Sequence, residues 1–132
     1  MTIFSNLLKS DKSDESAILN SGLHFSMEFG KDWMQPVQNR LKRKYGHLTK
    51  EQLDHYDAVC RKTREKACNF IYERLMALCH NQETIRRKAL KDSLNGFISE
   101  HYAWISVKNR RSLFSQGLYY AWKDGWDTCI KG

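Results

Sequence analysis

Three clusters of basic residues are the part of this sequence best suited to chemistry, because Lys and Arg bind phosphate groups and acidic protein surfaces. The clusters are Arg40, Lys42, Arg43 and Lys44; Arg86, Arg87 and Lys88; and Lys108, Arg110 and Arg111. Two aromatic residues, Tyr102 and Trp104, precede the third cluster. If both are exposed they can anchor a partner, and if they are buried they belong to the core. The sequence therefore predicts a basic and aromatic binding surface at these positions.

The charge is unevenly distributed along the chain. The net charge is +7, yet residues 40–111 hold 17 Lys/Arg against 8 Asp/Glu, and the two ends together hold 5 against 7. A basic middle attracts nucleic acid, an anionic membrane surface or an acidic protein. A solvated helix face rich in Lys and Arg is the alternative interpretation.

Thiol, carboxylate and imidazole groups give no recognisable catalytic or metal-binding pattern. No two cysteines form a C-x-x-C pair. We therefore expect reduced, buried thiols, as is usual in the cytoplasm. The four cysteines are Cys60, Cys68, Cys79 and Cys129. Asp32 and Asp127 end two similar segments and are expected to face water or cap a helix; a pair that binds a cation or acts in acid/base chemistry is the alternative. We therefore expect a non-enzymatic protein without a catalytic residue, metal or cofactor.

The elements that must position these residues are predicted to be helices. One proline and seven glycines in 132 residues are few breakers, and 41% of the residues are hydrophobic. We predict an all-α fold, an antiparallel bundle of four main helices, with residues 1–12 flexible and residues 13–132 forming one domain. The first helix is expected to start at Ser13 and to be kinked near Pro36.

The remaining helix ends are predicted from capping residues. Gly46 suits the left-handed residue that ends a helix, and Thr49 with Gln52 forms a capping box for the next. That next helix is long enough to bend or to support a dimer. Asn81 is expected to cap a helix beginning at Gln82. The last helix is expected to start at Ser112, with its apolar positions at Leu113, Leu118, Ala121, Trp122, Trp126 and Ile130.

An internal repeat relates the first and last helices. Residues 22–32 and 117–127 share glycine at two positions, a leucine and the final aspartate. Glycine inside a helix costs about 1 kcal/mol relative to alanine, so a compensating close contact is expected. We predict that the two helices occupy related positions and pack closely at Gly22, Gly30, Gly117 and Gly125; a chance match is the alternative.

One short stretch resembles a known family. Residues Lys44–Leu53, which include Tyr45-Gly46-His47-Leu48-Thr49, are similar to the Lys-Trp-Gly-x-Leu-Thr segment of CsbD-like bacterial stress proteins. Those proteins are small helical bundles of unclear activity. The match covers about ten residues and is not followed by the glycine-rich, charged sequence of the family. Helix capping alone accounts for Gly46 and Thr49, so no function is carried across.

These observations favour a small cytoplasmic helical protein that binds a macromolecular partner. We expect the partner to be another protein or a second copy of this chain, without membrane insertion. A nucleic-acid-binding regulator is the alternative, because phosphate contacts need only a basic surface.

Overall fold

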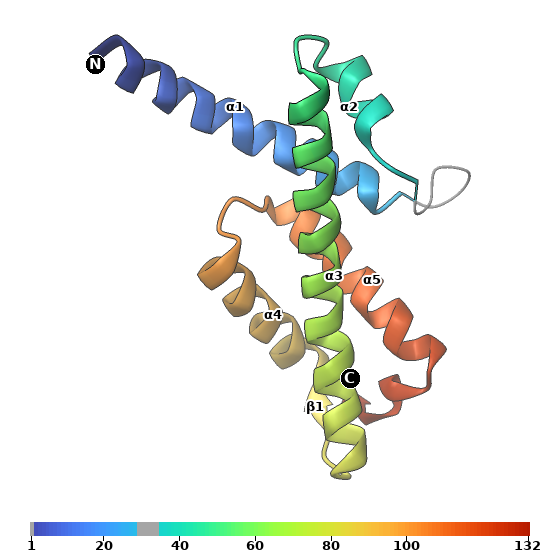
Figure 1. Cartoon of the computed structure of the whole chain (residues 1–132). Helices are drawn as coiled ribbons and strands as arrows, with labels where there is room; N and C mark the ends of the chain where they lie inside the picture. The colour runs from blue at the N-terminus through green and yellow to red at the C-terminus, as the bar shows by residue number, and fades with distance from the viewer. Residues whose placement is uncertain (1, 29–34) are drawn as a thin grey trace. The chain divides into compact units, whose positions relative to one another are not determined.

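The computed structural model describes residues 2–28 and 35–132, with side chains described from Asp14 onward. Its α-helices are α1 (Thr2–Ser26), α2 (Gln38–Lys44), α3 (Lys50–His80), α4 (Arg87–His101) and α5 (Val107–Lys123) (Figure 1). The short elements are strand β1 (Ile85–Arg86), the 3-10 helix η1 (Trp126–Cys129) and strand β2 (Ile130–Lys131). The described chain is thus mostly helical, which confirms the all-α class, with one short pair of strands added.

The chain forms two compact units that divide within α3. The N-terminal unit comprises residues 1–61 and the C-terminal unit residues 62–132. Each is described by itself below. The flexible segment predicted for residues 1–12 and the single domain predicted for residues 13–132 stay predictions.

The core of the N-terminal unit is formed by α1, α2 and the first half of α3. Its buried apolar side chains are Ile18, Leu19, Leu23, Met27, Val37, Leu41, Leu48, Leu53, Tyr56 and Cys60. On α1 the first four recur at intervals of one, four and four residues, the spacing of a single helix face. Full burial of a leucine side chain contributes roughly 1.5–3 kcal/mol, so this apolar face holds the unit together.

Helix α1 begins at Thr2, so the predicted start at Ser13 is wrong. The upstream residues contain neither glycine nor proline, and nothing in their backbone chemistry ends the helix. Pro36 lies two residues before α2, in the connection between the two helices. There Asp57 of α3 accepts a hydrogen bond from the backbone N–H of Val37 at 3.0 Å. A buried carboxylate thus satisfies a donor at the start of α2.

The connection between α2 and α3 contains the predicted capping box. The backbone N–H of Thr49 donates to Gln52 Oε1 at 2.9 Å, and the N–H of Gln52 donates to Thr49 Oγ1 at 3.2 Å. This confirms the start of α3. The left-handed role predicted for Gly46 is wrong, because its φ lies outside that region. Instead Lys42 Nζ donates to the carbonyls of Gly46 and Leu48 just past the end of α2.

The core of the C-terminal unit is formed by the second half of α3 with α4 and α5. Its fully or almost fully buried side chains include Ile71, Leu75, Leu90, Leu94, Ile98, Ile105, Leu113, Phe114 and Ala121. On α4 the three buried residues recur every four positions, so this helix shows a narrow apolar face. The face fixes which side of α4 is turned to the core.

Two predicted helix starts in the C-terminal unit are wrong. Gln82 has a left-handed backbone, with φ of 56°, and α4 begins only at Arg87, because β1 pairs in parallel with β2 in between. Helix α5 begins at Val107 rather than Ser112, since Ser106 Oγ accepts a hydrogen bond from the N–H of Asn109 at 3.2 Å. In both cases the helix start is set by backbone or capping hydrogen bonds, which the spacing of apolar residues does not reveal.

Across the described ranges, the structure contains no helix with the length and apolar character needed to span a bilayer.

Candidate binding site

Arg40 was predicted to belong to a binding surface, but the structure buries it. Its side chain is 9% exposed, and its guanidinium donates to the carbonyl of Phe25 at 2.6 Å and to that of Gln35 at 3.0 Å. A carboxylate oxygen of Glu28 lies 3.7 Å from Nη1. Arg40 therefore joins the end of α1 to the segment before α2, and it presents little charge to a partner.

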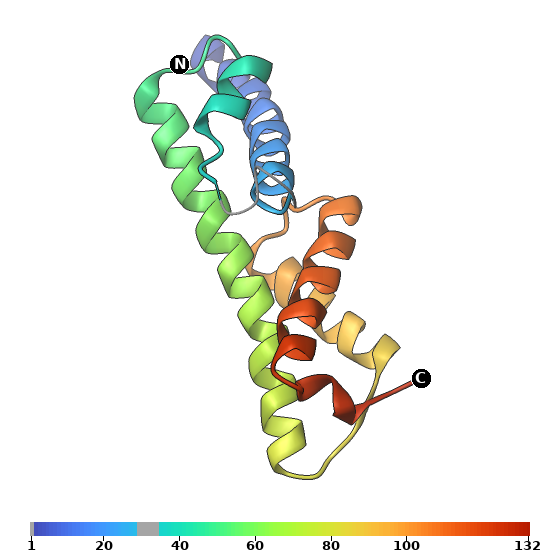
Figure 2. The same cartoon turned by 90° about the vertical axis from the view of Figure 1, so that its right-hand side faces the viewer.

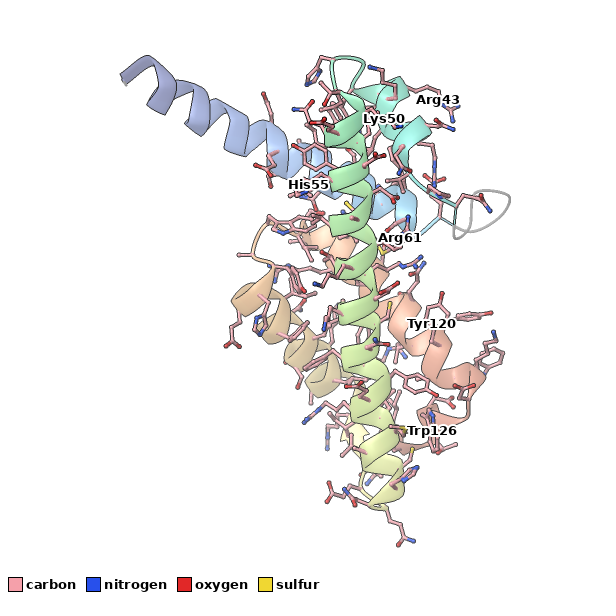
Figure 3. All side chains as sticks on the ribbon, viewed as in Figure 1. Arg43, Lys50, His55, Arg61, Tyr120 and Trp126 are labelled. Atoms are coloured by element: carbon pink, nitrogen blue, oxygen red, sulfur yellow. The ribbon has the colours of Figure 1, made fainter. Side chains whose placement is uncertain are left out.

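The other residues of the first cluster are exposed, but two of them have partners. Lys42 caps α2, as described above, and Lys44 Nζ donates to Ser21 Oγ at 3.0 Å. Arg43 and Lys50, labelled in Figure 3, line a hollow of about 610 Å³ together with Asp54. The mixed charge of this hollow makes it a poor site for a polyanion.

The two basic clusters of the C-terminal unit both lie beside α5. Lys108 and Arg111 are exposed in its first turns. Arg87 lies 5.6 Å over the ring of Phe114, halfway along, and lines a groove that reaches Trp122. Phe114 is only three residues after Arg111, about 4.5 Å along the helix axis, so Arg87 and the first turns of α5 lie beside one stretch of this helix.

The remaining predicted residues differ in how free they are to bind a partner. Arg86 and Lys88 are exposed, and Lys88 Nζ pairs with Asp92 at 2.9 Å. Arg110 donates to the carbonyl of Ile105 at 3.0 Å and to Ser99 Oγ at 2.9 Å, which ties the α4–α5 connection together. Tyr102 and Trp104, in that connection, are only half-exposed.

A groove on the C-terminal unit is the candidate site that holds an exposed tryptophan. It has a volume of about 480 Å³ and is lined by Arg87, Ser115, Leu118, Tyr119, Trp122, Asp127 and Ile130. Trp122 is 61% exposed, one of two large hydrophobic residues so exposed among the described side chains. Trp122, one of the apolar positions of the predicted last helix, is therefore not part of the core. Its exposed indole, together with Tyr119 and Arg87, has the composition of an interface anchor.

Helix α5 forms one wall of the groove. Tyr119 and Trp122 are three residues apart, so they lie on one face of the helix, and their ring centroids are 6.1 Å apart at an interplanar angle of 35°. Arg87, the first residue of α4, extends over Phe114 on the neighbouring turns of α5. Arg87 and the two aromatic residues thus line one groove, together with Asp127.

The segment after α5 forms the other wall, and Figure 2 shows α5 leading into η1 beside the C-terminal half of α3. Trp126, labelled in Figure 3, donates from Nε1 to the hydroxyl of Tyr72 at 3.1 Å. That hydroxyl in turn donates to Asp124, and the hydrogen bond raises the pKa of Tyr72 above its ordinary value. This chain of hydrogen bonds fixes η1, which carries Asp127, against α3.

The four glycines predicted to allow close packing have different surroundings. A Cβ added to Gly22 would lie 2.7 Å from Cys60 Sγ, and one added to Gly117 would lie 2.9 Å from Ile71 Cβ. Gly125 follows α5 and would meet nothing within 4 Å; its φ of 83° requires glycine there, so crowding is not its role. Gly30 and Asp32 lie outside the described residues.

The contact at Gly22 gives a test by a double-mutant cycle. Gly22→Ala should lower the free energy of unfolding by ~1–2 kcal/mol through overpacking against Cys60 Sγ. In Gly22→Ala/Cys60→Ala the nearest atom of residue 60 is its Cβ, at the ordinary distance of 3.8 Å. Urea unfolding followed by circular dichroism should therefore show the double variant to be less destabilised than the sum of the single variants. Strictly additive losses would mean that the sulfur does not cause the strain.

Cys60 and Cys68 are buried, as predicted from the sequence. Burial raises the pKa of the Cys60 and Cys68 thiols to about 12, which makes both poor nucleophiles at neutral pH. Cys79 and Cys129 differ, because they lie near each other at the end of α3.

The number of aromatic residues near the end of α5 could have indicated the groove from the sequence. Aromatic residues occur at Tyr119, Tyr120, Trp122 and Trp126, which point in more directions than one buried stripe can accommodate. At least one of them must therefore be exposed, and the structure identifies Trp122.

Comparison with known proteins adds no relative. No family model, no curated protein and no solved structure matches this chain. The function is therefore argued from the residues of the groove.

Proposed function

We propose that this protein is a non-enzymatic binding protein whose groove takes an acidic segment of another protein. The observation that carries the proposal is the exposed indole of Trp122, held beside Tyr119 and Arg87 in a preformed hollow. Tryptophan, tyrosine and arginine are the residues that most often dominate the energy of protein interfaces. An indole left exposed on a small protein costs solubility, so a partner that covers it is a reasonable expectation.

The charge of the C-terminal unit supports an acidic partner. Residues 62–132 hold 13 Lys/Arg against 7 Asp/Glu, a net charge of +6, whereas residues 1–61 hold 9 against 8. Arg87 lines the groove itself, and Arg111 and Lys108 continue along α5 at helical spacing. Such a field accelerates the encounter with an acidic chain and orients it.

The composition of the groove favours a peptide over a nucleic acid. Leu118 and Ile130 add apolar surface, which an apolar side chain of a peptide can cover and a phosphate group cannot. A bulky apolar side chain can instead enter between Trp122 and Ile130 while flanking carboxylates meet Arg87. A nucleic acid remains the competing occupant, because exposed aromatics beside basic residues also stack on unpaired bases.

The experiment is a selection of random peptides on the full-length protein, followed by affinity measurement. Enriched peptides should combine Asp or Glu with one bulky apolar residue. Fluorescence anisotropy of the best labelled peptide should show weaker binding to Trp122→Ala by about tenfold or more, as expected for an interface anchor. Val107→Ala is the matched control, because Val107 is 67% exposed on the same helix but lies outside the groove; it should bind as the native protein does.

Three other results would contradict the proposal. Equal loss in the two variants, or no loss in either, would remove the groove from binding. Salt-sensitive binding of a single-stranded oligonucleotide that depends on Trp122, with no peptide enriched, would favour nucleic acid. Self-association in sedimentation equilibrium that disappears in Trp122→Ala would make a second copy of the chain the occupant.

We also propose that the helices form an antiparallel bundle with related first and last helices, and that the protein is cytoplasmic. Gly22 and Gly117 each lie against a side chain of α3, which supports related roles for the first and last helices in an antiparallel bundle. The four free thiols suit a reducing compartment, which supports a cytoplasmic location.

A further inference from the structure

The end of α3 and η1 bring together two cysteines that are far apart in the sequence. Cys79 and Cys129 both donate to the backbone carbonyl oxygen of Trp126, each at 3.3 Å. The two sulfurs are therefore no farther apart than twice that distance. Burial raises the pKa of Cys129 to about 11, and the neighbouring Cys79 thiol adds to the rise. The two side chains thus converge on one carbonyl oxygen in the reduced protein.

The surroundings of the pair hold it in place. Cys129 also contacts the carbonyl oxygen of Leu75, one turn before Cys79 on α3, at 3.6 Å. The hydrogen bond from Trp126 to Tyr72 anchors the same segment two turns before Cys79. A disulfide requires the sulfurs to approach to about 2.05 Å. Both side chains already converge on one carbonyl group, and rotation about their Cα–Cβ bonds moves the sulfurs relative to each other.

We propose that Cys79 and Cys129 are a redox-active dithiol that forms a reversible disulfide with a peroxide as the oxidant. Cys79 is the half-buried member of the pair and Cys129 the buried one, so Cys79 meets the oxidant first. Its thiolate attacks one peroxide oxygen, the O–O bond breaks, and water leaves with the thiol proton, giving a sulfenic acid. The Cys129 sulfur then attacks the Cys79 sulfur, the S–OH bond breaks as the S–S bond forms, and the hydroxide leaves with the Cys129 thiol proton as a second water.

The balance is two thiols and one hydrogen peroxide to one disulfide and two waters. Two molecules of a small thiol such as glutathione reverse it by exchange, leaving both cysteines reduced and the small thiol oxidised. A cytoplasmic disulfide of this kind is transient and responds to oxidant, which agrees with free thiols in the resting protein.

The disulfide would act on the segment that forms one wall of the groove. Asp127 and Ile130 flank Cys129 in the sequence and line the groove, so a covalent link from Cys129 to α3 fixes their distance from Trp122. The cross-link itself does not depend on what the groove binds. Its chemistry can therefore be tested even if the proposed function is wrong.

The test is peptide mapping of the full-length protein after treatment with hydrogen peroxide. Each cysteine falls in its own tryptic peptide, namely residues 51–61, 67–74, 75–86 and 124–131. The monomer band from a non-reducing gel should yield peptides 75–86 and 124–131 joined, lighter than their sum by two hydrogens. Dithiothreitol should separate them. Cys60 and Cys68 should be recovered as thiols, since both are buried elsewhere.

Single variants give the controls. Cys129→Ser should leave Cys79 as a sulfenic acid that a dimedone probe labels, and Cys79→Ser should give neither the cross-link nor dimedone labelling of Cys129. Cys68→Ser should form the cross-link as the native protein does. Native protein that keeps both thiols while its methionines are oxidised, or that links Cys79 to Cys60 or Cys68 as often as to Cys129, would overturn the proposal.

Discussion

Gly117→Leu should lower the free energy of unfolding by about 3 kcal/mol, at the upper end of the cost of overpacking a core. A Cβ at this position would lie 2.9 Å from Cβ and 3.0 Å from Cγ1 of Ile71, inside the contact distance of carbon atoms. Ile71 is fully buried on α3 and has no free space to enter. The helices must therefore separate, and urea unfolding followed by circular dichroism measures the loss.

Gly96 supplies the matched control for Gly117. It lies inside α4, as Gly117 lies inside α5, but a Cβ there would meet nothing within 4 Å. Gly96→Ala should therefore gain the ordinary helix preference of alanine and stabilise the protein by up to about 1 kcal/mol. Gly117→Ala should destabilise it despite the same preference. If both alanine variants were stabilised, close approach at Gly117 would not be the reason for glycine there.

Arg40→Ala is expected to have the second largest effect, a loss of ~3 kcal/mol in the free energy of unfolding. The substitution removes the donors to the carbonyls of Phe25, Gln35 and Pro36 and leaves the carboxylate of Glu28 without its nearest cation. Part-buried acceptors that lose a charged donor, and the packing lost with the buried arginine side chain, carry most of this cost. Arg40→Lys should recover little, because one ammonium group cannot reproduce the fork of the guanidinium.

Arg43 is the comparison for Arg40. It lies three residues later on α2 and is exposed, so Arg43→Ala should change stability by less than about 0.5 kcal/mol. Thermal unfolding of the two alanine variants under identical conditions distinguishes a structural arginine from a surface one. Equal stability of the two variants would mean that the contacts of Arg40 contribute nothing net.

The sequence predicted those features that depend on neighbouring residues. The capping box of Thr49 and Gln52 is a local hydrogen-bond pattern, so it was predictable from the sequence. The predicted helix start at Gln82 failed, because the pairing of β1 with β2 depends on residues at the far end of the chain.

The candidate site was harder to predict for the same reason. Arg40 is buried because its guanidinium donates to the carbonyl of Phe25, which lies on another helix. The residues next to Arg40 in the sequence do not reveal this contact. Trp122 and Trp104 cannot be told apart by type or spacing, since each follows a helical apolar pattern. The pairing of Cys79 with Cys129 arises only when η1 folds back on α3. Long-range contacts decide all three.

The pairing of Ile85 with Ile130 also has a consequence for how the molecule opens. This pairing joins the two ends of one chain segment, which runs from β1 through α4, α5 and η1 to β2. Release of either strand frees both ends of that segment, so its amides should exchange with deuterium as one cooperative foldon. The pairing of β2 with β1 therefore stabilises the whole segment between them against opening.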